Sequence, residues 1–227
     1  MTSGDRGKPH HRRRNSSGVL DTLEVRILSG LAAMGVVVGL FLVRSQGSFV
    51  AGRFRDVRAE RPVPRSLEIL WVSAVTIPVI SLFAAAASPE LVYSPPLSVR
   101  VLADTVLQLV GYGLLAVGGF LLSTAIRHLG PYMVVQIAVR SDHRLVTSGP
   151  YARIRHPAYT SLMLMSLGGA MFFLNIVLFV DFLVVLAVAN YRARIEEALL
   201  SSPQGFGIQY RAYVARTGRF VPKLRTR

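Results

Sequence analysis

Two short polar segments flank a long apolar stretch in the C-terminal half of this chain. The first contains Arg155, His156 and Tyr159, and the second contains the acidic pair Glu196 and Glu197. Ionisable side chains are costly at the edge of a membrane, so their presence there indicates a function. If the apolar stretch folds back on itself as a helical hairpin, the two segments can close on one small polar ligand from both sides.

Pro157 directly follows His156 and begins the apolar stretch. Proline is favoured at the first position of a helix, and the residue before it is kept out of helical geometry. We therefore expect His156 at a helix N-terminus, where free N–H groups and the helix dipole favour an anion. The spacing fits equally well a plain cap at the lipid interface, with Arg153 and Arg155 contacting head groups.

Glu196 and Glu197 are expected just beyond the fifth apolar span, about 100° apart on a helix. Each has a basic residue at helical spacing, Arg192 for Glu196 and Arg194 for Glu197. Two surface ion pairs, each worth about 0.3 kcal/mol, would explain this pattern. The functional interpretation has one glutamate binding an ammonium, a sulfonium or a ribose hydroxyl, while an arginine holds the substrate. Taken alone, the residues favour the surface pairs.

Composition places the chain in a membrane. Of 227 residues, 52% are hydrophobic and only 17% are charged, against about 25% charged in ordinary soluble domains. The net charge of +14 would suggest nucleic acid on a soluble protein. Here the arginines flank the apolar runs, so anionic head groups explain them better, and we expect no nucleic-acid partner.

The chain has no cysteine, which excludes disulfides, thiolate catalysis and cysteine-ligated metals. The histidines His128, His143 and His156 lack the spacing and carboxylate pairing of zinc sites. We expect no metal.

The apolar runs predict an all-α integral membrane protein with about five transmembrane helices. The first three are expected at Val25–Val43, Leu67–Ala87 and Val101–Ile126. The run 158–190 would rise roughly 50 Å as one helix, which exceeds the ~30 Å hydrocarbon core. Two helices of about sixteen residues, turning near Asn175, fit better.

Several residues inside these spans carry their own expectations. Pro78 is expected to kink the second span. Asp181 lies within about two turns of the bend, so exposure at the far interface is expected. Close approach of the third span to a neighbour is expected from its small residues, which are Gly111, Gly113, Gly118 and Gly119.

Basic residues set the expected topology. The segments 44–66, 127–158 and 191–227 hold six, five and eight Arg or Lys residues, while 88–100 holds one and 174–181 none. The C-terminus and active site are therefore expected in the cytoplasm. The N-terminal tail, with five basic residues before Val25, does not fit this rule. Either the tail is translocated, or the first span does not cross fully, or a signal peptide is cleaved near Ser48–Gly52.

We expect three regions: a disordered basic tail over 1–22, a three-span membrane region over 23–126, and a catalytic region over 127–227. The third region contains motifs that together resemble the isoprenylcysteine carboxyl methyltransferase family and related phospholipid methyltransferases. In order these are Leu145-Val146-Thr147-Ser148-Gly149-Pro150-Tyr151, Arg155-His156-Pro157-x-Tyr159, Arg194-x-Glu196-Glu197, Phe206-Gly207-x-x-Tyr210-x-x-Tyr213 and Arg219-Phe220-Val221-Pro222. Relatives usually have acidic residues where this chain has Gly207-Ile208-Gln209, and the first three spans carry no matching motif.

The resemblance implies an S-adenosylmethionine-dependent methyltransferase in which the C-terminal hairpin and a cytoplasmic helix form the cofactor site. Residues implied to line that site are Leu145, Val146, Gly149, Tyr151, His156, Pro157, Tyr159 and Glu197. Residues implied to act near the transferred methyl are Arg194, Glu196 and Arg155. The implied partners are the lipid bilayer and a hydrophobic or lipidated methyl acceptor.

The acceptor chemistry stays open on these residues. A carboxylate acceptor is ionised at pH 7 and needs a cation, Arg194 or Arg155, to hold it. An amine acceptor, as in phospholipid N-methylation, would need a base such as His156 or Glu196. A membrane reductase using NADPH and a non-enzymatic membrane scaffold are rival hypotheses.

Overall fold

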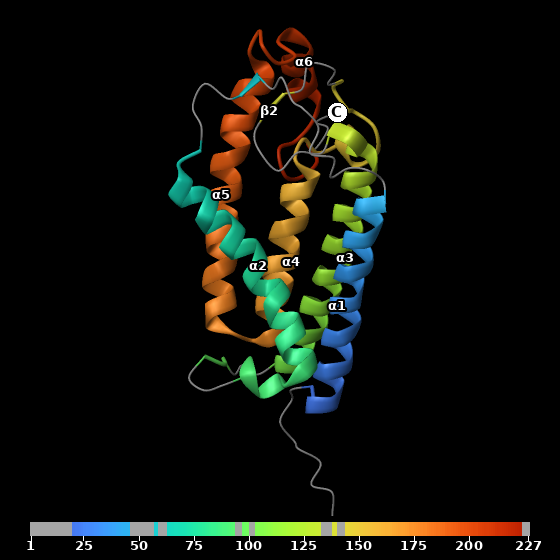
Figure 1. The fold of residues 1–227 in the computed structure, drawn as a ribbon, viewed down its shortest axis with the longest axis vertical. Coiled ribbons are helices and arrows are strands. Elements are labelled where there is room, and N and C mark those ends of the chain that lie inside the picture. Colours follow the sequence, from blue (N-terminus) through green and yellow to red (C-terminus); the bar gives the residue numbers. More distant parts are fainter. Residues whose placement is uncertain are drawn as a thin grey trace, which may run out of the picture.

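The computed structural model describes residues 20–45, 57–58, 63–93, 97–99, 103–132, 138–139 and 144–223. It is a bundle of long helices with the short helix α6 at one end (Figure 1). The α-helices are α1 (Thr22–Ser45), α2 (Arg65–Ala87), α3 (Asp104–Leu129), α4 (Pro157–Phe173), α5 (Ile176–Ser201) and α6 (Ile208–Arg216). Short 3-10 helices are η1 (Pro89–Leu91), η2 (Gly130–Tyr132) and η3 (Gly149–Ala152). Strands β1 (Val57–Arg58) and β2 (Ala138–Val139) form a two-residue antiparallel pair.

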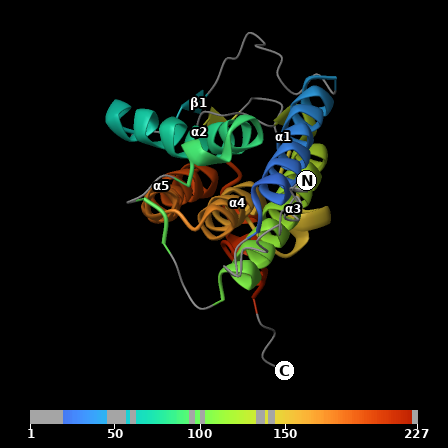
Figure 2. The same ribbon diagram turned by 90° about the horizontal axis from the view of Figure 1, so that it is seen from below.

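Within the described residues, four helices are long and apolar enough to cross a membrane: α1, α2, α3 and α5. The chain is thus an all-α, multi-pass integral membrane protein. The prediction of about five spans exceeds this count, because α4 has only 17 residues. At 1.5 Å per residue it rises about 25 Å, less than the ~30 Å hydrocarbon core. Figure 2 shows α4 in the middle of the bundle, with α3 on one side and α5 on the other.

The predicted bend at Asn175 is confirmed. The Asn175 side chain caps α5 by accepting hydrogen bonds from the N–H groups of Val177 and Leu178, at 2.9 and 3.4 Å. Its own amide donates to the Val92 carbonyl at 2.9 Å, which ties the bend to the segment after α2. Leu174 turns the chain with a φ of 47°.

The predicted length of the helix after the bend is wrong. This helix, α5, has 26 residues and continues to Ser201, so Glu196 and Glu197 lie inside it and not beyond its end. The polar residues do not end the helix because Arg and Glu are good helix formers, and neighbouring segments cover some of them, such as Arg192, which is 1% exposed.

Glycines bring α3 and α4 close together, as expected, but only two of the four predicted residues do so. A Cβ at Gly111 would lie 2.5 Å from the Phe172 nitrogen, and one at Gly118 would lie 2.6 Å from the Met165 side chain. Gly113 and Gly119 have open space around them. The contact is therefore specific to one face of α3.

Asp181 is buried, at 6% exposed, so its predicted exposure at the far interface is wrong. Its Oδ2 accepts a hydrogen bond from the Ser166 hydroxyl at 3.2 Å. The reason is that α4 packs along the face of α5 that carries Asp181. Pro78 is buried within α2, and the helix continues on both sides of it.

The N-terminal end of α1 lies at the opposite end of the bundle from α6 (Figure 1). Val25 and Ala33 of α1 are buried in the core. Most of the predicted tail, residues 1–19, lies outside the described residues, and so does the predicted cleavage region Ser48–Gly52.

Candidate active site

The two polar segments meet at the α6 end of the bundle. The Arg155 Nε donates a hydrogen bond to Glu197 Oε1 at 2.8 Å, and the His156 Nε2 lies 3.2 Å from the same oxygen. Beside them, the Tyr159 hydroxyl donates to Glu196 Oε2 at 3.1 Å. The helical hairpin therefore brings together all five residues that were expected to meet.

Glu197 is the centre of this cluster. In addition to Arg155 and His156, it accepts hydrogen bonds from Arg219, whose Nη2 lies 2.5 Å from Oε2 and whose Nε lies 3.1 Å from both oxygens. The side chains of Arg155 and Glu197 are 8% and 13% exposed. The hydrogen bond with Glu197 raises the pKa of Arg219 above its ordinary value.

Arg219 was missing from the predicted site residues. It is the first residue of the Arg219–Pro222 motif, and that motif was the signal in the sequence. Its position follows from the chain after α6, which returns alongside the segment before α4. There the Arg155 N–H donates to the Gly218 carbonyl at 2.9 Å and the His156 N–H donates to the Arg219 carbonyl at 3.1 Å.

His156 is the N-cap residue of α4, as predicted, but its side chain makes no capping bond. The ring is 5% exposed and stacks on the Tyr159 ring with centroids 5.4 Å apart. Its Nδ1 lies 3.7 Å from Glu196 Oε2, so its two nitrogens face two carboxylates. Arg155 also points inward, and the interpretation as a plain lipid-interface cap is therefore wrong for these two side chains.

Tyrosines form a buried wall near the carboxylates. Tyr151 in η3 and Tyr210 and Tyr213 in α6 are all buried, and the Tyr213 hydroxyl donates to the Tyr151 carbonyl at 2.6 Å. Burial raises the pKa of Tyr151 and of Tyr210, and the negative charge of Glu196 adds to both effects. These phenols stay neutral and can act as hydrogen-bond donors at physiological pH.

The remaining predicted residues lie around this cluster. Gly149 has a φ of +57°, and a side chain there would run into the His128 ring at the end of α3. Leu145 and Val146 are half-buried in the segment leading to η3, and Pro157 is the first residue of α4. Arg194 is exposed, and it contributes no hydrogen bond or ion pair to the cluster of described residues.

The two predicted surface pairs on α5 do not form. Arg192 instead donates from Nη1 to Glu68 Oε2 of α2 at 2.6 Å, and its guanidinium lies 5.5 Å from the centroid of the Trp71 ring. Sequence reasoning missed Glu68 and Trp71, because nothing local connects α2 with α5, 124 residues away.

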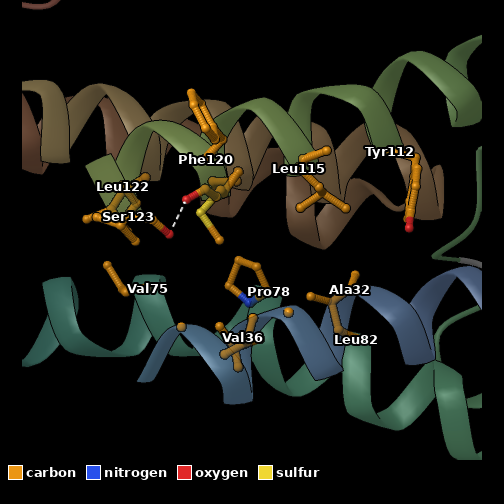
Figure 3. Close-up of a pocket in the computed structure, with 18 of the residues that line it drawn as sticks. Ala32, Val36, Val75, Pro78, Leu82, Tyr112, Leu115, Phe120, Leu122 and Ser123 are labelled. Carbon is orange, nitrogen blue, oxygen red and sulfur yellow. Dashed lines mark hydrogen bonds between the residues drawn. The ribbon is translucent and has the colours of Figure 1, made fainter. Parts of the chain in front are cut away.

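An apolar cavity of about 500 Å³ begins one helical turn deeper in the bundle. Figure 3 shows side chains of α3, such as Leu115 and Tyr112, across from Pro78 of α2 and Ala32 of α1. Two lining residues, Ala74 and Leu162, follow Trp71 and Tyr159 by three positions on their helices. Trp71 and Tyr159 pack edge to face, with centroids 5.6 Å apart, between the cavity and the carboxylates.

Among the described residues, no group of three or more His, Asp or Glu side chains is arranged to hold a metal ion.

Comparison with known proteins finds similarity to one family. Residues 111–202 match the family model described as the isoprenylcysteine carboxyl methyltransferase family. The chain is 34% identical over 121 residues to a Schizosaccharomyces pombe protein-S-isoprenylcysteine O-methyltransferase, covering 52% of this chain and 50% of that protein. It is 33% identical over 115 residues to the Arabidopsis thaliana protein-S-isoprenylcysteine O-methyltransferase B, covering 49% of this chain and 57% of that protein.

A solved structure of the eukaryotic intramembrane Ras methyltransferase, an isoprenylcysteine carboxyl methyltransferase, is also similar. It has 28% identity and a TM-score of 0.49, over 70% of this chain and 54% of that one. The chain spans about half the length of the curated relatives that it matches. The region 111–202, which contains α4, α5 with the carboxylate pair, and most of α3, is the part that matches the isoprenylcysteine carboxyl methyltransferase family.

Proposed function

We propose that this protein is an integral membrane methyltransferase that uses S-adenosylmethionine to methylate the carboxyl group of a lipidated acceptor. The observation that carries the proposal is the meeting of Arg155, His156 and Tyr159 with the Glu196–Glu197 pair. The names of the two curated relatives support the same reaction and suggest an S-isoprenylcysteine as the acceptor.

The residues present fit the chemical groups of S-adenosylmethionine. That molecule has a carboxylate, an ammonium, a sulfonium and ribose hydroxyls, so its site needs both cations and carboxylates. Glu196 is the more accessible acid, since its side chain is 33% exposed and its bond to Tyr159 engages only Oε2. When bound, S-adenosylmethionine would supply an activated methyl group on a sulfonium.

The proposed cofactor-binding set comprises Leu145, Val146, Gly149, Tyr151, His156, Pro157, Tyr159 and Glu197. Within it, Glu197 is already paired with three cationic or polar side chains. We therefore assign it the task of holding α5, the segment before α4 and the segment after α6 in one arrangement. Glu196 then presents its carboxylate to the ammonium or to a hydroxyl.

The acceptor carboxylate is ionised at neutral pH and needs no general base, so this site has to hold and align it. Arg194 is exposed and not held by the cluster, which leaves its guanidinium able to make a bidentate contact with that carboxylate. Arg155 is the less suitable cation because Glu197 already engages it at 2.8 Å.

The cavity suits the apolar part of such an acceptor. Its lining is almost entirely aliphatic and aromatic, and it ends one helical turn from Tyr159. The acceptor would enter from the bilayer and the cofactor from the cytoplasm. In this proposal the α6 end faces the cytoplasm, residues 127–227 form the catalytic region and residues 23–126 the supporting membrane region.

Methyl transfer from labelled S-adenosylmethionine by the purified protein tests the proposal. We expect an S-prenylated cysteine to be methylated and its S-methyl analogue, which lacks the tail, to react far more slowly. Mild base should release labelled methanol, because esters hydrolyse and methylamines do not. Label retained on an amine would support phospholipid N-methylation, and binding of NADPH but not S-adenosylhomocysteine would support the reductase.

A further inference from the structure

We propose that Glu68 is a positioning residue for the candidate active site and that it acts on Tyr159 through Arg192 and Trp71. Glu68 lies in α2, outside the residues 111–202 that match the family model. A helix without any recognised motif would thus contribute to the chemistry. The inference rests on the proposed function of the site.

The starting point is the burial of Arg192, which is 1% exposed. Removing a guanidinium from water is expensive unless a counter-charge and hydrogen bonds compensate for it. Glu68 supplies that charge at 2.6 Å, and its side chain is 38% exposed. The Trp71 ring, with its centroid 5.5 Å from the guanidinium, adds a cation–π contact. Through these two residues, α2 fixes where the guanidinium of Arg192 sits.

The second step leads from Arg192 to the site through Trp71. The ring that the Arg192 guanidinium contacts also packs edge to face on the Tyr159 ring, with the two centroids 5.6 Å apart. The Tyr159 hydroxyl in turn donates a hydrogen bond to Glu196 Oε2 at 3.1 Å.

The result is a series of contacts from Glu68 to Arg192, then through the Trp71 ring to Tyr159 and on to Glu196. Because Trp71 packs on the Tyr159 ring, α2 restrains the position from which the Tyr159 hydroxyl donates to Glu196. Without Glu68, Arg192 would turn toward water or toward Glu196, and the Tyr159 hydroxyl would lose its fixed direction. A purely structural strut between α2 and α5 would instead affect stability alone.

The experiment uses the full chain in lipid nanodiscs and compares Glu68→Gln with the control Glu90→Gln. Glu90 lies in η1, beyond the other end of α2, so both variants lose one negative charge near this helix. Trp71 is the only tryptophan of the chain, so its emission reports directly on the Arg192 contact. We expect Glu68→Gln to change Trp71 emission and to lower kcat about tenfold, with a parallel loss of S-adenosylhomocysteine affinity because Tyr159 and Glu196 belong to the proposed cofactor site. Glu90→Gln should change none of these.

A double-mutant cycle with Tyr159→Phe tests whether the effect passes through the hydroxyl. If it does, Glu68→Gln should cause no further loss of kcat in the Tyr159→Phe background. Independent, multiplying losses would overturn the proposal, as would unchanged Trp71 emission in Glu68→Gln. Should wild-type protein fail to bind S-adenosylhomocysteine, the proposed function fails. The emission change would then still decide whether Glu68 positions Arg192.

Discussion

Helices α3 and α5 are almost equally apolar, yet the protein buries different shares of their apolar segments. In α3, 22% of the residues of that segment are buried, and in α5 the share is 39%. The N-terminal helices α1 and α2 resemble α3, with 17% and 28% buried. The protein thus covers more of α5 than of the other three helices, although all four expose large apolar side chains that can face lipid. Hydropathy reports whether a segment can enter a membrane, but the partner of each face depends on packing.

The N-terminal and C-terminal regions also differ in how their charged side chains are placed. In the C-terminal region one carboxylate, Glu197, joins three segments through Arg155, His156 and Arg219. The N-terminal region surrounds an apolar cavity and reaches the site through Glu68 of α2. The shielded polar groups are thus concentrated in the C-terminal region, and the N-terminal helices surround the apolar cavity beside them.

The largest effect is expected from Glu197→Gln. Removing this charge leaves Arg155, 8% exposed, without its counter-ion, and breaking such a pair costs about 3 kcal/mol. We expect S-adenosylhomocysteine affinity to fall about a hundredfold or more, measured by calorimetry, together with a lower unfolding temperature. The control is Glu24→Gln, at the exposed start of α1, which should leave binding unchanged. Normal affinity in Glu197→Gln would contradict the assigned role.

A pair of alanine substitutions on α3 tests the packing side of the contrast. Gly111→Ala would place a Cβ 2.7 Å from the Gly168 carbonyl, and backbone atoms cannot yield without separating α3 from α4. We expect a loss of about 2–3 kcal/mol in stability, as for other overpacked positions. Gly113→Ala meets open space and should be neutral or slightly stabilising. Thermal unfolding in detergent measures both, and equal stability of the two variants would be inconsistent with this interface.

Arg194→Ala should separate catalysis from stability. Because Arg194 is exposed, its removal should leave the unfolding temperature unchanged, yet the loss of an acceptor contact should lower kcat/KM about tenfold. The matched control, Arg211→Ala, removes an exposed arginine from α6. Steady-state kinetics with an S-prenylated cysteine measures the effect; an unchanged kcat/KM would remove Arg194 from the active site.

The smallest effect is expected in the cavity. Gly119 lines it and has open space where a side chain would begin, so Gly119→Leu should occupy part of the volume. We expect KM for a long-tailed acceptor to rise about threefold, with S-adenosylhomocysteine affinity unchanged. The adjacent Gly35→Leu, on the α1 wall, should act in the same direction. Acceptors with short tails should be unaffected, and a uniform effect on all acceptors would argue against tail binding here.

Three places in the chain show which features could be predicted from the sequence and which could not. The Asn175 bend was predictable because a 33-residue apolar run is too long for one crossing and contains a polar capping residue. The meeting of His156 with the glutamate pair was predictable because a hairpin brings its ends together. The burial of Asp181 was not predictable, because Asp181 is buried by the face of α4 that carries Ser166. Which face of α4 packs there depends on its contacts with α3, such as the one at Gly111.

The linear chain by itself determined that this is a helical membrane protein, where the hairpin turns and which polar motifs lie at its ends, because these depend on local composition and spacing. Only the tertiary structure decided the partners of the charges. The spacing of four residues on one helix predicts a pair between Arg192 and Glu196. The structure instead pairs Arg192 with Glu68, 124 residues away. A local pair in water gains only about 0.3 kcal/mol, whereas a buried guanidinium requires whichever carboxylate the packing brings against it.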